Sequence, residues 1–424
     1  MFNFRAFFVS LLQKNYFYEI DTEKSMKRFA VILLVSVIAI VPIYAQENPD
    51  LLYLSKQSAH RTEFILPQIN GYNIYKADLH VHTVYSDGYL TGRGRVVEAY
   101  QDGLDIIAIT DHIEVRPNEA YFLKATKGYH KQLPKARNIS IHREPCDKYG
   151  ILADLNVSFD EANRFGKRNG ILVIKGAEIT REPDSVGHYN ALFIEDANTI
   201  YHDNPEMAIR NARKQGALIM HNHPGWRRTT TDKNAFHKKI YSAGLIDGVE
   251  VVNGRHFGPK LIKRCLDENL FMAGATDIHG LTSSNYAQCG YFRTCTFILA
   301  KECTEEAIKE ALVEDRTLVF SANNVIGEES LLRELFHNSV TMKVIHTFPK
   351  GQKVVTLTNT SSIPYQIDFS GRQKDTLLEP FQSISINLAK NEELSITVMN
   401  LWTADDKNPN GKHLKVCCKA ENMK

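Results

Sequence analysis

The sequence predicts an α/β fold in which a closed barrel of strands and helices is followed by a small all-β domain. Between residues 75 and 325, strand-like apolar runs alternate with amphipathic helical segments, which indicates a mainly parallel sheet with helices outside it. Ligand-type side chains follow nearly every run, and only a closed ring of about seven strands would gather them at one mouth. After residue 338 the pattern changes to short strands with period-two alternation, at the spacing of a β-sandwich.

Local signals place the elements of the barrel in chain order. The predicted strands are 75–79, 104–109, 171–175, an apolar stretch opened by His188, 217–220, 247–252, 270–275, 294–300 and 317–320. Helices are expected at 94–102, 204–215, 232–242, 259–268 and 304–313. One more helix is expected to be capped by Ser158, with Glu161 completing a capping box and Gly170 closing it.

Three further regions flank or interrupt this pattern. Residues 46–74 are interpreted as a lead-in, and residues 75–325 as the barrel. An insertion at 114–156 is polar and broken by prolines, and loops of this length are typical of functional lids or disorder. Residues 338–424 form the predicted sandwich-like domain, which carries no clustered ligand-type residues. We assign it to packing, partner contact or surface attachment.

The N-terminal region has the order of a secretory signal. From Met26 the chain reads Lys27, Arg28, an apolar run over 29–41 and a cleavage site after Ala45. The run is short for a membrane span, which needs about 20 apolar residues. We therefore expect residues 1–45 to be an N-terminal extension and signal peptide, with Met26 as the true start and export to the periplasm. An uncleaved anchor is the alternative, and no membrane span is expected after cleavage.

Charge argues against a nucleic-acid-binding protein, and cysteine spacing argues against a thiolate zinc protein. Removal of residues 1–45 leaves 46 basic and 46 acidic residues, so the exported chain is formally neutral. Neutrality disfavours nucleic acid as a partner, because nonspecific affinity for it comes from Lys and Arg on phosphates. The seven cysteines show no C-x-x-C spacing, which argues against a thiolate zinc site. Cys289 and Cys295 are candidates for a disulfide in an exported protein.

Imidazole and carboxylate side chains recur at six predicted strand ends. His80 and His82 are two positions apart on an extended strand, so both rings point to the same face. The other residues at these positions are Asp87, Asp111, His112, Glu178, His188, His221, His223, Asp277 and His279. Mixed imidazole and carboxylate ligands suit Zn, Mn or Fe, whereas Ca or Mg would favour oxygen alone.

Six motifs in this order carry a family resemblance: HVHTVYSDG, ITDH, GAEI, GHYNALF, HNHPG and GATDIHG. The chain resembles the PHP (polymerase and histidinol phosphatase) superfamily of metal-dependent phosphoesterases over residues 75–325. Its architecture and the segment DHIEVRP are similar to those of the Sb-PDE family of phosphodiesterases. The resemblance implies a distorted (β/α)7 barrel that holds a trinuclear centre. The expected cofactors are two or three divalent transition metal ions.

The same resemblance assigns ligands to three metal positions. His80, His82, Glu178 and Asp277 would hold the first metal. Glu178 would bridge to a second, completed by His188 and His223. The third would take Asp87, His112 and His279. His223 matches the family position in HNHP, so His221 is interpreted as structural, and Asp111 as a hydrogen-bond acceptor that supports the site.

Arginines on the loops at the presumed mouth are candidates for binding phosphate. Arg181 follows Glu178 closely, Arg227 and Arg228 follow the HNHP motif, and Arg116 has a similar place. A planar guanidinium matches a pair of phosphate oxygens, although solvated loop arginines are the alternative for each. Together with Arg181, the third-metal residues Asp87, His112 and His279 are the candidate catalytic residues.

These observations predict a metal-dependent hydrolase of a small-molecule phosphate ester. A metal-activated hydroxide would attack phosphorus, which requires no covalent nucleophile. Phosphodiester hydrolysis is favoured by the family branch and the expected export. The alternatives are a phosphomonoesterase of the histidinol-phosphatase type, a metal-containing binding module without turnover, and a nuclease, which the neutral charge argues against.

Overall fold

The computed structural model describes residues 60–117, 154–181, 185–369 and 373–418. These residues belong to one compact unit. The expected signal segment and the start at Met26 lie outside the described residues, as do positions 118–153 of the expected insertion and 46–59 of the lead-in. Over the ranges that are described, no helix combines the length and the apolar character needed to cross a membrane.

A continuous sheet forms the barrel and runs in the order β10-β9-β1-β2-β3-β4-β5-β6, with β8 beside β6. Its strands are β1 (Asn73–Val81), β2 (Ile106–Ile109), β3 (Leu172–Arg181), β4 (Gly187–Leu192), β5 (Leu218–Asn222), β6 (Gly248–Asn253), β8 (Phe271–Ala275), β9 (Cys295–Ala300) and β10 (Thr317–Ser321). Just after β8, Ile278 forms a parallel bridge with Val81, so the downstream end of β8 meets the end of β1. The strand ends that carry the predicted ligands therefore face one another.

The sheet is mixed, whereas the alternation of strands and helices predicts a mainly parallel one. The pairs β1–β2, β2–β3, β5–β6 and β6–β8 are parallel. In contrast, β4 is antiparallel to both β3 and β5, and β9 is antiparallel to both β1 and β10. Only residues 182–186 connect β3 to β4, and this length is too short for the crossover that a parallel pair needs.

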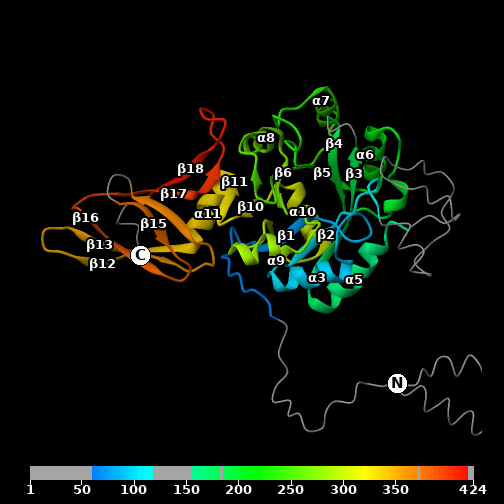
Figure 1. The fold of residues 1–424 in the computed structure, drawn as a ribbon. Coiled ribbons are helices and arrows are strands. Elements are labelled where there is room, and N and C mark those ends of the chain that lie inside the picture. The colour runs from blue at the N-terminus through cyan, green and yellow to red at the C-terminus, as the bar shows by residue number, and fades with distance from the viewer. Residues whose placement is uncertain (1–59, 118–153, 182–184, 370–372, 419–424) are drawn as a thin grey trace, which may run out of the picture. The chain divides into compact units, whose positions relative to one another are not determined.

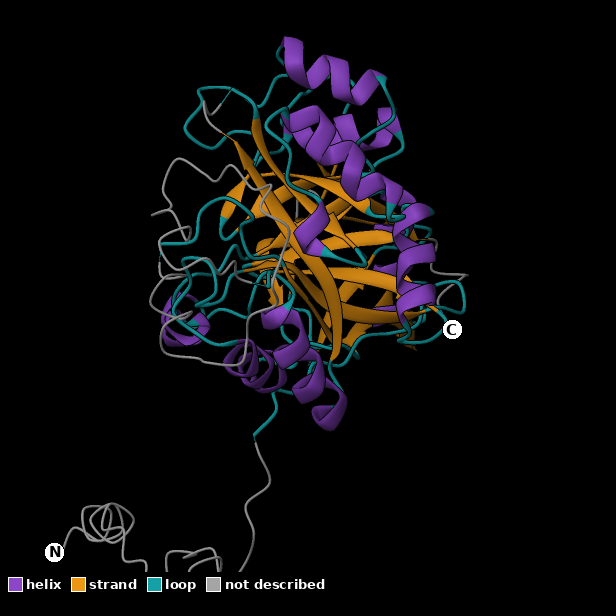
Figure 2. Ribbon diagram, turned by 90° about the vertical axis from the view of Figure 1, so that its right-hand side faces the viewer, coloured by secondary structure: helices purple, strands orange, loops and turns teal. Residues whose placement is uncertain are grey.

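Helices cover the strands, as the alternating pattern predicts (Figure 2). They are α3 (Gly92–Gln101), α5 (Val157–Asn169), α6 (Pro205–Lys214), α7 (Ala235–Ser242), α8 (Lys260–Glu268), the short α9 (Thr282–Asn285) and α10 (Glu305–Val313), with 3-10 turns η2 (Ala197–Thr199) and η3 (Ala287–Cys289). Each longer helix buries a stripe at helical spacing. For example, α10 buries Ile308, Ala311 and Leu312 against the sheet and exposes its acidic face.

The predicted capping box at the start of α5 is wrong. The N-cap is Asn156, whose amide donates to Asp154 and Asp196 instead of capping the helix. Glu161 accepts a hydrogen bond from the backbone N–H of Gly92 at the start of α3, at 3.1 Å. The two helices lie side by side (Figure 1), and a Cβ at Gly92 would lie only 2.5 Å from the carbonyl oxygen of Ser158. This contact therefore requires glycine.

The C-terminal region contains the predicted antiparallel strands, and two elements that were not predicted lead into it. These two are β11 (Asn324–Gly327) and α11 (Glu329–Ser339). The strands that follow are β12 (Val340–Thr347), β13 (Lys353–Asn359), β14 (Tyr365–Phe369), β15 (Gln373–Leu378), β16 (Ser383–Leu388), β17 (Leu394–Thr403) and β18 (Lys412–Cys418). One sheet has the order β12-β13-β16, and the other strands join the barrel sheet because β17 pairs with β11. The predicted α/β fold with a small β region at the C-terminus is thus confirmed.

The hydrophobic core continues from the barrel into the C-terminal strands. One buried cluster contains Phe297 and Phe320 of the barrel together with Leu357 and Val398 of the C-terminal region. In the described part of the chain, Cys289 and Cys295 do not form the candidate disulfide. Cys289 is an exposed free thiol, whereas Cys295 is buried in β9 and packs as a small apolar residue.

Candidate metal centre

The ends of the strands bring all nine predicted ligands into one cluster, most of which is buried. His80 and His82 lie at the end of β1, are fully buried, and approach each other with their Nε2 atoms 3.0 Å apart. Three overlapping groups have ligand atoms within 4.8 Å of one another. They are His80, His82 and Asp277; His80, Glu178 and His223; and His82, Asp87, His112 and His279.

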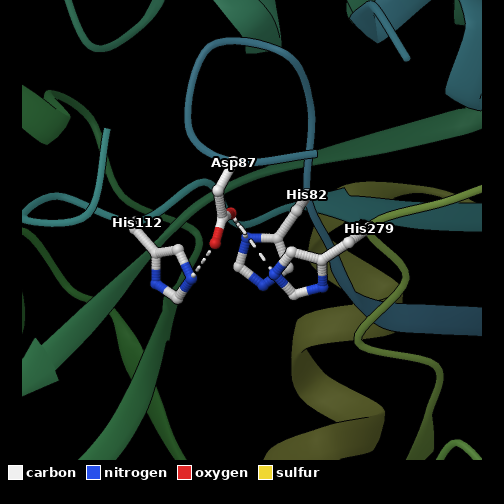
Figure 3. Close-up of side chains that lie close together, drawn as sticks. All are labelled: His82, Asp87, His112 and His279. Atoms are coloured by element: carbon white, nitrogen blue, oxygen red, sulfur yellow. Dashed lines mark ion pairs between the residues drawn. The ribbon is translucent and has the colours of Figure 1, made fainter. Parts of the chain in front are cut away.

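The third group forms a compact set around one carboxylate (Figure 3). The two oxygens of Asp87 lie 3.5 Å from Nε2 of His112 and 3.3 Å from Nε2 of His279. The ring of His82 lies between them, with Nδ1 3.9 Å from Asp87. Asp87 enters this set from a turn after β1, in which the backbone N–H of Gly88 donates to the carbonyl of Thr83.

Glu178 lies between two sets of imidazoles and presents one oxygen to each. Its Oε1 lies 3.6 Å from Nε2 of His80, 3.2 Å from Nδ1 of His188 and 3.7 Å from Nε2 of His223. Its Oε2 lies 3.5 Å from Nε2 of His82 and 2.6 Å from Nδ1 of His112. A carboxylate in this position has the geometry needed to bridge two cations.

Asp277 completes the cluster from a strained backbone position. Its Oδ1 lies 3.3 Å from His80 and 3.1 Å from His82, and its Oδ2 lies 3.7 Å from His223. Asp277 has φ 53° and His223 has φ 28°, a region that residues other than glycine seldom adopt. Such strain costs on the order of 1–3 kcal/mol and concentrates at functional sites.

The electrostatics of the cluster favour ionised carboxylates beside protonated imidazoles. Burial lowers the pKa of His80, but Asp277, Glu250 and Glu178 outweigh it and hold that pKa well above its usual value. Burial is likewise outweighed at His112, whose pKa Glu178 and Asp87 raise to about 10. Burial, followed by the neighbouring His112 and His279, lowers the pKa of His82 to about 4. In the metal-free cluster, His80 and His112 therefore carry protons that bound cations would displace.

Several buried atoms of the cluster have no hydrogen-bond partner in the described part of the chain. They include Nε2 of His188 and Nδ1 of His82. Unsatisfied buried polar atoms are rare in folded proteins because each costs free energy. Imidazole nitrogens without partners, next to carboxylate oxygens, are the donor set that a divalent transition metal requires. The residues therefore fit metal ions.

Comparison with known proteins assigns the family. A model of the PHP domain matches residues 78–258. A crystal structure of a two-domain protein from Bacteroides vulgatus, containing a predicted PHP-like metal-dependent phosphoesterase, shares 32% identity with a TM-score of 0.73. That alignment covers 86% of this chain and 100% of the other. The chain belongs to the PHP domain family.

A second solved structure matches this chain more distantly. It is a proposed metal-dependent phosphoesterase from Bifidobacterium adolescentis, 16% identical with a TM-score of 0.36. The match covers 56% of this chain and 96% of that one. Among curated proteins, no significant match to the chain is found.

Buried residues that sequence reasoning missed support the ligands of this PHP domain. Glu250 on β6 lies 2.9 Å from Nδ1 of His80 and accepts a hydrogen bond from the backbone N–H of His223 at 2.7 Å. Asn222 donates to Oε1 of Glu178 at 2.9 Å and to Asn190 at 2.8 Å. An acid inside the apolar run GVEVVN was the available signal for Glu250. Asn222 and Asn190 stand inside the HNHP and GHYN motifs, where the sequence does not distinguish them from other strand residues.

Asp111 supports the PHP centre through the loop after β1. It accepts three hydrogen bonds of 2.6 Å, from the backbone and hydroxyl of Thr83 and from the hydroxyl of Ser86. The predicted role as a supporting acceptor is thus matched, but the donors belong to the Asp87 turn and not to an imidazole. His221 is buried away from the three ligand groups, and its Nδ1 lies 2.8 Å from the hydroxyl of Tyr241.

The candidate phosphate-binding arginines have protein partners. Arg181 lies 2.8 Å from Glu114 and donates to the carbonyl of His202 at 2.5 Å. Arg116 is buried and donates to the carbonyl of His112, whereas Arg228 donates to the carbonyls of Pro224 and Asp232. The guanidinium of Arg227 lies 4.1 Å from the ring centre of Trp226. Phosphate binding by these arginines stays a prediction.

Proposed function

We propose that this PHP domain is an exported phosphodiesterase, similar to the Sb-PDE family, that uses two or three Zn, Mn or Fe ions. The observation that carries the proposal is Glu178, whose two oxygens face two different sets of imidazoles. Bound together, such ions lower the pKa of water toward neutral and offset charge on a reacting phosphate. In this proposal His80, His82, Glu178 and Asp277 hold the first ion, His188 and His223 hold the second with Glu178, and Asp87, His112 and His279 hold the third.

The exposure of the ligands indicates where a substrate approaches. The side chains of His80 and His82 are fully buried, while those of His279 and Asp87 are 36% and 25% exposed. Asp87 and His279 are therefore the most accessible of these four ligands. In this proposal Arg181 contacts the phosphate, for which its guanidinium would exchange its present partners, Glu114 and the carbonyl of His202.

A pair of chromogenic substrates tests the proposal and ranks its alternatives. The purified chain, supplied with Mn or Zn, should release p-nitrophenol faster from bis(p-nitrophenyl) phosphate than from p-nitrophenyl phosphate, and a chelator should stop the release. A faster monoester reaction would favour the histidinol-phosphatase type. No metal-dependent release from either substrate would favour a binding module without turnover.

A matched pair of variants ties the activity to the cluster. Asp277→Asn removes a charge that lies within 3.7 Å of four imidazoles, and should reduce kcat/KM at least a hundredfold. Asp267→Asn makes the same chemical change on α8, where the side chain is 56% exposed and forms an ion pair with Lys263. This control should keep full activity. Equal activity of the two variants would show that the cluster takes no part in the reaction.

Export is proposed from the signal-like segment and needs its own test. Expression of the whole sequence in a Gram-negative host, followed by N-terminal sequencing of the periplasmic fraction, should give a chain that begins at Gln46. A chain of full length in the membrane fraction would support the uncleaved anchor instead.

A further inference from the structure

A cavity of about 330 Å³ opens beside the metal centre. His223 and Glu250 form its inner wall, and its outer wall includes Trp226, His256 and Phe257. Trp226 and Phe257 keep 42% and 37% of their surface exposed, although large aromatic side chains are usually buried. A cavity of roughly 150 Å³ already holds benzene, so the volume is sufficient for a planar ring.

The indole of Trp226 is held at the border between this cavity and the ligands of the second metal position. Its backbone N–H donates to the carbonyl of His223 at 2.8 Å, which closes a tight turn after β5. The turn brings the indole ring to 5.4 Å from the ring of His223 and 5.1 Å from the ring of His188, centre to centre. The indole of Trp226 is therefore close enough to contact a group bonded to a phosphate at the centre.

The far wall of the cavity is a small hairpin that the C-terminal strands support. β7 (His256–Phe257) pairs with the end of β6, and the ring of Phe257 packs edge-on against Trp402 of β17 at 5.8 Å. Trp402 is itself held by a hydrogen bond from its indole N–H to Asn324 at 3.1 Å. The C-terminal region thus fixes the position of an aromatic side chain beside the candidate active site.

Both charged side chains that are named in the lining, Arg227 and Glu250, already have partners, which favours an uncharged group. The guanidinium of Arg227 lies 4.1 Å from the ring centre of Trp226. Glu250 is the one carboxylate among the described residues that line the cavity. Its oxygens are already engaged with His80, the backbone of His223 and Asn253. Val251 and Leu261 add apolar surface. Aromatic faces with apolar neighbours bind flat rings through stacking and burial.

We propose that the cavity between Trp226 and Phe257 is a subsite for a planar, uncharged group that is esterified to the phosphate of the substrate. The inference rests on the proposed phosphoesterase activity and names a substrate class for it. Simple aryl groups and nucleobases share this chemistry. They differ in the distance between ring and phosphate, because a nucleoside places its sugar in between.

The chain contains two tryptophans, so its fluorescence can report on this subsite without turnover. In a zinc-loaded Trp402→Phe protein, Trp226 is the single indole. Phenylphosphonate should change its emission saturably, whereas methylphosphonate, which has the same anionic head and no ring, should not. A similar response to thymidine 5′-phosphate would extend the subsite to nucleobases, and a response to thymidine 5′-phosphate alone would assign it to them. Equal responses to phenylphosphonate and methylphosphonate, or no response to any ring-bearing ligand, would overturn the subsite.

Substitutions then test each wall of the cavity. Adding Phe257→Ala to the Trp402→Phe protein should weaken binding of the ring-bearing ligand about tenfold, the order expected for one lost aromatic contact. Phe348→Ala is the matched control, because Phe348 is 43% exposed in the turn from β12 to β13 and does not line the cavity. Equal affinities of the two variants would contradict the proposal.

Inhibition of turnover gives an independent readout. Trp226→Ala should raise the inhibition constant of phenylphosphonate about tenfold and leave that of methylphosphonate unchanged, and Trp226→Phe should restore most of the difference. If no phosphate ester is hydrolysed but phenylphosphonate still changes Trp226 emission, the proposed function fails and the subsite stands. If hydrolysis occurs and the Trp226 variants discriminate as the native chain does, the subsite fails alone.

Discussion

Nδ1 of His80 lies 2.9 Å from Oε1 of Glu250, and both side chains are fully buried. This contact turns the other ring nitrogen, Nε2, toward His82, Glu178 and Asp277. A carboxylate behind a metal-binding histidine fixes the tautomer and raises the basicity of the ligand nitrogen. Glu250 also accepts from the backbone of His223, so one side chain orients ligands of two metal positions.

Glu250→Ala should therefore lower metal affinity by about ten- to a hundredfold, the usual cost of losing such a partner. Glu250→Gln should cost less, because its amide oxygen can still accept from Nδ1–H of His80. Competition with a fluorescent zinc chelator measures both affinities. Glu268→Gln, at the end of α8, is the control and should bind zinc as the native chain does. Unchanged affinity in Glu250→Ala would exclude this role.

The clustering of nine candidate ligands could be predicted because strand ends are readable in sequence. The H-x-H spacing at residues 80 and 82 places two rings on one face, and the structure brings both together with Glu178 and Asp277. The apolar runs also located every barrel strand, since buried strands read as continuous hydrophobic segments. The apolar runs do not indicate the direction of each strand. The antiparallel position of β4 depends on the short connection after Arg181, and the hydrophobic pattern carries no information on that connection.

The supporting residues could not be predicted for a different reason. Glu250 contacts His80 from a strand 170 positions away, and this contact depends on which strands are neighbours in space. Arg95 lies in the first turn of the helix predicted at 94–102, and arginine on a helix normally faces solvent. Such partners become visible only when the arrangement of the strands is known.

Removal of metal should lower stability in a way that depends on pH. Neighbouring carboxylates raise the pKa values of His80 and His112 in the metal-free chain, so these imidazoles are protonated at neutral pH. Their stabilising ion pairs are complete below the unfolded pKa of about 6.5 and are lost as pH rises through the folded pKa, which is about 10 for His112. Metal binding displaces these protons, and the gain in Tm on adding zinc should therefore be larger at pH 8 than at pH 6.

Calorimetry in two buffers with different ionisation enthalpies checks this prediction directly. Zinc binding at pH 7 should release protons to the buffer, and a hundredfold excess of zinc over Kd should stabilise the fold by about 3 kcal/mol. A binding enthalpy that is the same in both buffers would show that the imidazoles are already neutral, contrary to the prediction.

Arg95 should be essential for the loops that carry His82 and His279. Its buried guanidinium donates to the carbonyls of His82 and His279 at 2.7 Å each, and to Glu98 at 2.7 Å. Arg95→Met removes these donors and leaves Glu98 without its ion-pair partner. This change should cost about 3–5 kcal/mol in the free energy of unfolding. Arg95→Lys should also destabilise, because an ammonium cannot reproduce the planar fork.

Urea denaturation measures the loss at Arg95. Arg333→Met is the control, since the side chain of Arg333 is 38% exposed and its pair with Glu329 lies on the surface of α11. That control should change the free energy of unfolding by at most about 1 kcal/mol. If Arg95→Met lowers the free energy of unfolding no more than this control does, the loops are held by other contacts.

His221 and His223 stand two positions apart and should behave differently when either is replaced. Nε2 of His223 faces both Glu178 and Asp277 at 3.7 Å, whereas Nδ1 of His221 lies 2.8 Å from the hydroxyl of Tyr241. Burial, reinforced by His237 and Arg264, holds the pKa of His221 well below its usual value, so this ring is neutral at pH 7. His223→Asn should therefore reduce the number of zinc ions per chain in elemental analysis, with a modest change in Tm of the metal-free protein. His221→Asn should keep the metal content and lower Tm, because the buried contact with Tyr241 is lost. A loss of bound zinc in both variants, with equal Tm values, would place His221 among the ligands and contradict the assignment made from HNHP.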